Sequence, residues 1–233
     1  MSQSGKRVAI HQPNYLPWIG YFHKIALVDE FIFFDDVQLP QGKSFCSRVK
    51  ILGTNGSQWL TVPVSKGADV MIKDARIVDD GWRRKHLKTL EISYRKSPHF
   101  DLWWPEVSRI LGGADDRLVE LNIALIEAIS RLAGLKTQFR RASELDIGEG
   151  DASDHIDRIL HAVGCGTYVS GQGAGSRRYI DDDKIRSMGM RLEWQEFSHP
   201  VYQQGQHAFE ENMSVVDLLS FDGPKFLFES QIA

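Results

Sequence analysis

Residues 7–34 pass from an apolar run to a helical pattern and back to an apolar run, and this order constrains the fold more than any other feature of the sequence. Residues 7–10 predict a short buried strand, and residues 18–28 predict a helix because apolar side chains recur at helical spacing after Pro17. Residues 31–34 predict a second strand that is buried on both faces. Together these elements form a βαβ unit, which closes with a right-handed crossover.

A second alternation of strands and helices follows in the C-terminal part of the chain. Its first helical pattern has Ser153 placed as the N-cap and Gly164 just past the end. The predicted elements, in the order strand, helix, strand, helix and strand, are residues 137–145, 154–164, 167–171, 176–189 and 190–197. This order predicts an α/β fold with a mostly parallel sheet flanked by helices.

Residues 44–80 differ from both flanks, because they hold three β-leaning runs separated by glycine-containing turn clusters. We expect a small antiparallel, β-rich insert there. A helical segment follows at residues 82–135, with predicted helices at residues 82–95, 100–111 and 117–132. All 233 residues are expected to form a single α/β domain.

Composition argues against several classes of protein. The formal net charge of -3 indicates no nucleic-acid partner. Cys46 and Cys165 are too few for a disulfide framework, and without a CxxC pair we expect no structural zinc site. No residue is assigned as a metal ligand, and the metal requirement stays open. The sequence shows no signal peptide and no apolar run near the ~20 residues of a membrane helix. We therefore expect a cytoplasmic protein without an integral membrane segment that acts on a small molecule, while the cofactor and the oligomeric state stay open.

Polar side chains gather in the loop between the first strand and the first helix. In α/β sheets, ligands bind beyond the carboxyl ends of the strands, where the winding direction reverses. His11 can act as an acid or a base near neutral pH. Gln12 and Asn14 can bond amides or hydroxyls, and Tyr15 adds a phenol. The alternative is a stiffened connection in which His11 bonds a backbone group, but the density of polar groups favours a functional loop.

Two more loops at strand ends carry candidate groups. Asp35 and Asp36 follow the second predicted strand, where they could hold a divalent cation, accept bonds from sugar hydroxyls or act as a base; a solvated turn is the alternative. The glycine loop at residues 171–176 lies between a strand and a helix, a context that favours an anion. It is neither GxGxxG nor a P-loop, so an ordinary glycine turn is the alternative.

Three other residues or segments complete the candidates. Arg48 lies in an alternating strand and could reach inward, or it could be an ordinary edge-strand arginine. Cys46 has no neighbour in sequence that would lower its pKa, so a buried thiol is favoured over a nucleophile. Residues 199–204 repeat the first loop's histidine, proline, tyrosine and glutamine, and they share its edge of the sheet if the last strand is parallel to the first.

Several segments resemble the WbqC-like protein family. They are HQPNYLPWIGYFHKI at 11–25, DEFIFFDDVQ at 29–38, SRVKI at 47–51, WLTVPV at 59–64, TYVSG at 167–171, HPVYQQ at 199–204 and SVVDLLSFDGP at 214–224. Members of that family are associated with gene clusters for O-antigen and other surface polysaccharides, which implies a role around nucleotide-activated or lipid-linked sugars. The family's W-x-N-R pattern is FCSR here, so Arg48 carries over, whereas Ser47 replaces the asparagine.

The resemblance implies a transferase of surface-polysaccharide biosynthesis that acts on an activated amino sugar, by acyl or aminoacyl transfer. The alternatives are a nucleotidylyltransferase-like enzyme, although its HxGH pair is absent, and a non-catalytic nucleotide-sugar-binding protein. The predicted catalytic residues are His11, Asp36, Arg48 and His199. The predicted substrate-binding residues are Gln12, Asn14, Tyr15, Trp18, Asp35, Ser170, Gly171, Gly173, Arg177, Arg178, Tyr202 and Gln203.

Overall fold

The computed structural model describes residues 5–65, 67, 69–78, 80–113, 115–148, 154–173, 176–177 and 180–224. The chain divides into two compact units. Unit 1 comprises Met1–Gln12, His23–Phe34 and Lys136–Ser198, and unit 2 comprises Pro13–Phe22, Asp35–Leu135 and His199–Ala233. The chain therefore passes from unit 1 to unit 2 within the first loop and returns within helix α1 (Ile19–Ala26). The expectation of a single domain stays a prediction.

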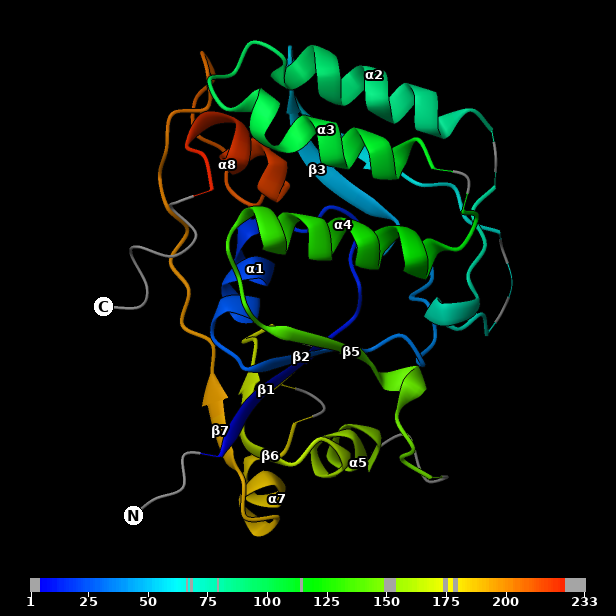
Figure 1. Cartoon of the computed structure of the whole chain (residues 1–233), viewed down its shortest axis with the longest axis vertical. Coiled ribbons are helices and arrows are strands. Elements are labelled where there is room, and N and C mark those ends of the chain that lie inside the picture. Colours follow the sequence, from blue (N-terminus) through cyan, green and yellow to red (C-terminus); the bar gives the residue numbers. More distant parts are fainter. Residues whose placement is uncertain are drawn as a thin grey trace. The chain divides into compact units, whose positions relative to one another are not determined.

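Unit 1 is built on a five-stranded sheet in which every pair of neighbouring strands is parallel (Figure 1). The strand order is β5-β2-β1-β6-β7. The strands are β1 (Lys6–His11), β2 (Glu30–Phe33), β5 (Gln138–Arg141), β6 (Cys165–Ser170) and β7 (Arg191–Trp194). The predicted α/β fold with a mostly parallel sheet is confirmed.

The winding direction of this sheet reverses beside β1. From β1 the chain continues to β2 and β5 on one side, and it later adds β6 and β7 on the other. Val8 of β1 accordingly lies opposite Glu30 of β2 and opposite Tyr168 of β6. Because the strands are parallel, the carboxyl ends of β1 and β6 lie at one edge of the sheet, and this edge is its topological switch point.

Two helices of unit 1, α5 (His155–Ala162) and α7 (Asp182–Ser187), pack against β6 and β7 respectively. Ile159 and Leu160 of α5 and Ile185 of α7 are buried with Val8 and Tyr168 in one apolar cluster. Full burial of one aliphatic side chain contributes roughly 1.5–3 kcal/mol, so this cluster holds the helices on the sheet.

The ends of these helices follow local sequence signals. Gly164, just beyond α5, has a φ of 66°, a conformation that glycine adopts without strain, and this confirms the predicted end of the helix. The predicted N-cap Ser153 lies outside the described residues. Within the helix predicted at residues 176–189, Ser176 and Arg177 are helical, and α7 begins at Asp182. The Asp181 carboxylate accepts the backbone N–H groups of Asp183 and Lys184 and so caps α7.

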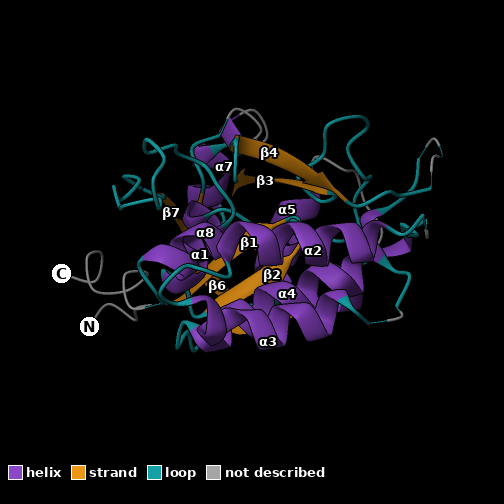
Figure 2. Ribbon diagram, turned by 90° about the horizontal axis from the view of Figure 1, so that it is seen from above, coloured by secondary structure: helices purple, strands orange, loops and turns teal. Residues whose placement is uncertain are grey.

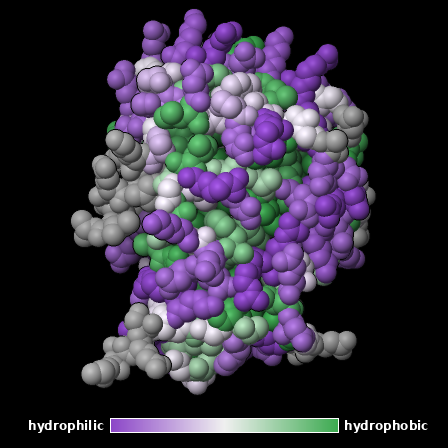
Figure 3. Space-filling model, in the orientation of Figure 1, coloured by the Kyte–Doolittle hydropathy of each residue, from purple (hydrophilic) through white to green (hydrophobic). Residues whose placement is uncertain are grey.

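Unit 2 combines helices with a two-stranded hairpin. Its elements include β3 (Arg48–Gly53), β4 (Gly56–Thr61), α2 (Trp82–Tyr94), α3 (Phe100–Leu111), α4 (Leu118–Leu132) and α8 (Val215–Phe221). Figure 2 shows α2, α3 and α4 running alongside one another, and α2 also packs against β3 while α3 packs against α8. Polar residues cover most of the surface that α2 and α3 present in Figure 3. The three helices predicted in the segment 82–135 are confirmed.

The predicted β-rich insert is correct only in part. The antiparallel pairing of β3 with β4 is confirmed. Residues 71–78, predicted as β structure, instead hold the 3-10 helix η1 (Ile72–Asp74) and isolated bridges. The reason lies in their backbone partners, because Ile72 N–H donates to the Val37 carbonyl and Lys73 N–H donates to the Asp35 carbonyl, rather than to an adjacent strand. Similarly, β5 ends at Arg141 and a 3-10 helix, η2 (Ala142–Glu144), follows it within the predicted strand 137–145.

Candidate functional site

The switch point of unit 1 brings together polar groups from several elements. His11 ends β1, Ser170 ends β6, and Gln195 directly follows β7. Lys24 comes from α1, and its ammonium nitrogen would lie 3.4 Å from a side-chain carbon placed on Gly171. The same added carbon would lie 3.8 Å from Gln195 Oε1. We call His11, Lys24, Ser170, Gly171 and Gln195 the switch-point cluster.

The His11 ring is held in one tautomer. Its Nδ1 lies 3.0 Å from the Gln12 carbonyl oxygen, and since a carbonyl oxygen only accepts, Nδ1 donates and the lone pair is on Nε2. Burial lowers the pKa of His11 to about 3, and the charge of Lys24 is the second cause. The hydrogen bond to the Gln12 carbonyl acts in the opposite direction. The imidazole is therefore neutral at physiological pH, with Nε2 unprotonated.

The described residues of the glycine loop in unit 1, 171–173 and 176, include Gly171 of this cluster. Ser170 is buried, whereas Gly173 and Arg177 are exposed. The Arg177 guanidinium donates to Gln172 Oε1 at 3.0 Å and lies 4.9 Å from the centre of the Trp194 ring. Arg178 lies outside the described residues. The proximity of Gly171, which directly follows Ser170, to Lys24 could not be read from the sequence.

Three residues of this region were not among the predicted site residues. His23 is only 4% exposed, and its Nδ1 accepts from the Gln195 side-chain amide at 2.8 Å. Lys24 is likewise only 4% exposed. The available signal was the pair of basic residues, His23 and Lys24, within a helix that is otherwise apolar, and Gln195 had no signal in the sequence.

Unit 2 holds a different group of candidates around a cavity of about 290 Å³. Its lining residues are Asn14, Tyr15, Pro17, Trp18, Phe45, Arg48, Val49, Lys50 and Asn212, and we call it the hairpin cavity. The Arg48 guanidinium lies 3.6 Å from the centre of the Trp59 ring, a cation–π arrangement that fixes its orientation. Three predicted substrate-binding residues, Asn14, Tyr15 and Trp18, thus share one cavity with the predicted catalytic residue Arg48.

Tyr15 lines this cavity, while its hydroxyl contacts helix α2. The ring is fully buried, and the hydroxyl lies 2.9 Å from Nδ1 of His86 on α2. His86 also bonds the Thr61 carbonyl, so its other nitrogen donates and Nδ1 accepts from Tyr15. Burial raises the pKa of Tyr15 above its ordinary value. Tyr15 is therefore a neutral phenol at physiological pH.

The first loop is fixed by contacts to distant parts of unit 2. Asn122, buried on α4, donates to the Pro13 carbonyl at 2.9 Å and to the Cys46 carbonyl at 2.7 Å. Leu16 has a φ of 40°, which is strained for a residue other than glycine. Its carbonyl accepts from the Ser214 hydroxyl at 2.8 Å, just before α8. Asn122 could not be recognised from the sequence, because its partners are carbonyl groups far away in the chain.

The 199–204 segment meets the first loop within unit 2. The His199 ring stacks on the Trp18 ring with centroids 6.4 Å apart. His199 Nδ1 lies 2.9 Å from the Pro200 carbonyl, and Nε2 accepts the Asn212 N–H at 3.3 Å, so backbone groups contact both nitrogens. The Tyr202 hydroxyl donates to Asp217 at 2.8 Å, while Gln203 is exposed.

The remaining candidates in unit 2 differ in burial. Asp35 is fully buried and Asp36 is half-buried. Burial raises the pKa of the Cys46 thiol to about 11, which favours a structural role for it. Among the described residues, no group of three histidine, cysteine, aspartate or glutamate side chains could hold a metal ion.

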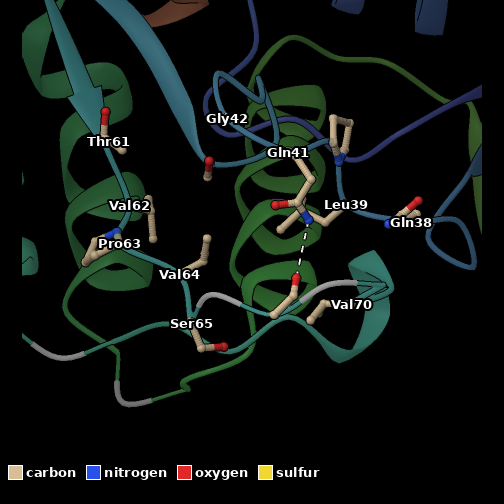
Figure 4. Close-up of a pocket in the computed structure, with 13 residues that line it drawn as sticks. Gln38, Leu39, Gln41, Gly42, Thr61, Val62, Pro63, Val64, Ser65 and Val70 are labelled. Carbon is tan, nitrogen blue, oxygen red and sulfur yellow. Dashed lines mark hydrogen bonds between the residues drawn. The ribbon is translucent and has the colours of Figure 1, made fainter.

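A larger cavity of unit 2, of about 690 Å³, carries none of the predicted site residues. Figure 4 shows Leu39 and Gln41 on one side of it and Val62, Pro63 and Val64 on the other. Gln41 Nε2 donates to the Gly67 carbonyl at 3.3 Å across its rim. Its lining has no charged side chain among the described residues, so it offers no group for acid–base chemistry.

We expect the free energy of unfolding to fall as the pH drops from about 6.5 to about 4. Burial lowers the pKa of His23 and of His86 from 6.5 to about 4 in the folded protein. Below pH 6.5 these rings bind protons in the unfolded chain but not in the folded chain. The part of the free energy of unfolding that they contribute above pH 6.5 is therefore lost on acidification. Each ring contributes at most about 1.4 kcal/mol per pH unit in this window.

Urea unfolding at several pH values measures this effect. His86→Gln should make the pH dependence less steep, whereas His161→Gln, which changes an exposed histidine of α5, should leave it unchanged. An equally steep dependence in His86→Gln and in the unmodified protein would contradict the assignment.

The parallel sheet flanked by helices, with polar groups at its switch point, makes this chain an α/β protein. Within the described residues, no helix has the length and apolar character needed to cross a membrane. The family model of the WbqC-like protein family matches residues 12–227, and the chain belongs to that family. It is similar to the uncharacterized protein Rv1507c of Mycobacterium tuberculosis (strain ATCC 25618 / H37Rv), with 33% identity over 218 residues that cover 92% of this chain and 93% of that protein.

Proposed function

We propose that this protein is a transferase of surface-polysaccharide biosynthesis that moves an acyl or aminoacyl group onto an activated amino sugar. The polysaccharide context comes from the association of the WbqC-like family with such gene clusters. The observation that carries the enzymatic part is His11, a neutral imidazole at the switch point of a parallel sheet with its lone pair on Nε2. Switch points are where α/β proteins bind their ligands.

His11 supplies the base that such a transfer needs. The amine of the sugar attacks the carbonyl carbon of the activated acyl donor, a C–N bond forms, and the bond between that carbon and the leaving group breaks. Nε2 of His11 takes the proton that the amine loses, and the leaving group departs with the electron pair of the broken bond. General base catalysis of this kind contributes about 10²- to 10⁴-fold to a rate.

The hairpin cavity of unit 2, described by itself, has the chemistry of a sugar-binding site. Trp18 offers an aromatic face, Asn14 offers an amide, and Arg48 offers a cation held over Trp59. Aromatic faces pack on the apolar side of sugar rings, and amides bond their hydroxyls. We therefore propose Asn14, Trp18 and Arg48 as sugar contacts.

Nucleotidylyl transfer is the second candidate function. The observation in its favour is that His11 and Gly171 follow adjacent strands at the switch point, where nucleotide phosphates bind in many α/β proteins. The observation against it is that the first loop lacks the HxGH pair of nucleotidylyltransferase-like enzymes.

A substrate panel separates these functions. The purified protein is incubated with nucleotide-activated amino sugars and with acyl and aminoacyl donors, and products are detected by mass spectrometry. The proposal expects a sugar product heavier by the transferred group. Release of pyrophosphate from nucleoside triphosphates and sugar phosphates, without acyl products, would favour the second candidate. Binding without turnover across the panel would instead favour a non-catalytic nucleotide-sugar-binding protein.

A further inference from the structure

Lys24 is a buried cation without a carboxylate partner in the part of the chain that the structure describes. Only 4% of it is exposed. Two other lysines of unit 1 contrast with it, since Lys6 pairs with Glu30 and Lys184 pairs with Asp154 and Asp157. Burying a charge is unfavourable unless an opposite charge or several hydrogen bonds compensate it.

The nearest acidic residues in sequence are engaged elsewhere in unit 1. The Asp29 carboxylate accepts the Arg7 N–H at 2.8 Å. Glu30 pairs with Lys6 and, at 3.3 Å, with Arg140. Lys6 and Glu30 are the first residues of β1 and β2, so this ion pair lies where the two strands begin. Lys24 instead lies next to Gly171, just after the end of β6. The acids of the neighbouring strands therefore do not supply its counterion.

The space beside the Lys24 ammonium is kept open by a glycine. A side-chain carbon at position 171 would lie in van der Waals contact with the ammonium nitrogen, at 3.4 Å, so a larger side chain would cover this face of Lys24. The charge of Lys24 also lowers the pKa of His11, so the two groups interact electrostatically. Lys24 thus lies beside the glycine turn that follows β6, and its charge reaches the neutral histidine at the end of β1.

We infer that Lys24 is the cation of a phosphate-binding subsite at this switch point, and that it holds a phosphate group of the activated sugar. The identification of the ligand as an activated sugar rests on the proposed function. The phosphate subsite itself rests on the buried cation and the glycine turn. A phosphate fits better than a carboxylate, because glycine turns after a strand let the backbone approach phosphate oxygens closely.

The protonation of Lys24 suits this role. Burial lowers the pKa of its ammonium group to about 8, so it is still mostly charged at neutral pH. A bound phosphate offsets this charge, which is the second cause of the lowered pKa of His11. Phosphate binding therefore raises the pKa of His11 and makes Nε2 a stronger base when the substrate is present.

Titration calorimetry with pyrophosphate tests the subsite without any turnover. Pyrophosphate should bind the unmodified protein, and Lys24→Met should weaken this binding at least ten-fold. Lys24→Arg keeps the charge and should bind within a few-fold of the unmodified protein. Lys136→Met, which removes an exposed lysine of the same unit, is the matched control and should bind normally. Circular dichroism verifies that each variant is folded.

A second readout follows the His11 ring by NMR, with its signal assigned from a His11→Gln variant. Pyrophosphate should raise the pKa of His11 in the unmodified protein and should leave it unchanged in Lys24→Met. Absence of pyrophosphate binding to the unmodified protein, equal binding by Lys24→Met, or equally tight binding of acetate would overturn the inference. Failure of the substrate panel alone would overturn the proposed transferase and would leave the phosphate subsite standing.

Discussion

His11→Gln is expected to lower kcat for the group transfer by about 10²- to 10⁴-fold, with little change in KM. Glutamine keeps a polar side chain of similar length but has no nitrogen that can accept a proton. The attacking amine of the substrate then loses its base, while contacts that bind the substrate in the ground state stay in place. Initial rates with the substrate pair found in the panel, measured over a range of substrate concentrations, separate the two constants.

The matched control for this prediction is His161→Gln. His161 is an exposed histidine of α5 in the same unit, so its loss should leave both constants unchanged. The pH profile adds a check, since the lowered pKa of His11 means that kcat/KM should not decline near pH 6.5 because of this group. A His11→Gln variant with a kcat within a few-fold of the unmodified enzyme would rule out His11 as the base.

Asn122→Ala is expected to destabilise the protein by about 2–4 kcal/mol and to lower the activity as well. The two N–H groups of its amide hold the buried carbonyls of Pro13 and Cys46, at 2.9 and 2.7 Å. Alanine leaves both carbonyls without a donor and opens a small cavity on α4. The first loop then loses the contact that fixes its start, so Asn14 and Tyr15 are held less firmly. Thermal and urea unfolding give the stability change.

Ser130→Ala is the control for Asn122→Ala, because it removes another buried polar side chain from the same helix. Among the described residues, the Ser130 hydroxyl has no hydrogen-bond partner, so its removal should change the stability by less than about 1 kcal/mol. Equal destabilisation by the two substitutions would show that the amide bonds of Asn122 are not what stabilises the loop.

Much of unit 1 could be predicted from hydrophobic patterns, because local patterns determine its elements. The runs at residues 7–10 and 31–34 became β1 and β2, which pair in parallel. The order of the strands could not be predicted, because it depends on how the later strands pack beside β1. The meeting of the first loop with the glycine loop at the strand ends could be expected from the general rule for such sheets, whereas the position of the switch point between β1 and β6 emerged only from the structure.

The candidate residues show the same division between local and distant information. The polar loop after β1 could be recognised from its composition. The partners that define the chemistry of Tyr15 and His11 could not, because the Tyr15 hydroxyl bonds His86 from another helix and Lys24 had been assigned only to a helical pattern. A lysine in a helix is usually exposed, and only the packed structure shows that this one is buried.

The strained turn at Leu16 has a consequence for the synthesis of the chain. The Leu16 carbonyl is held by Ser214 and the Pro17 carbonyl by the Val215 N–H at 2.8 Å, so the groups that fix this N-terminal loop come almost 200 residues later. On the ribosome these donors emerge almost 200 residues after the loop itself. The nascent chain must therefore carry an unfinished loop until residues 214 and 215 have been made and can fold back onto it.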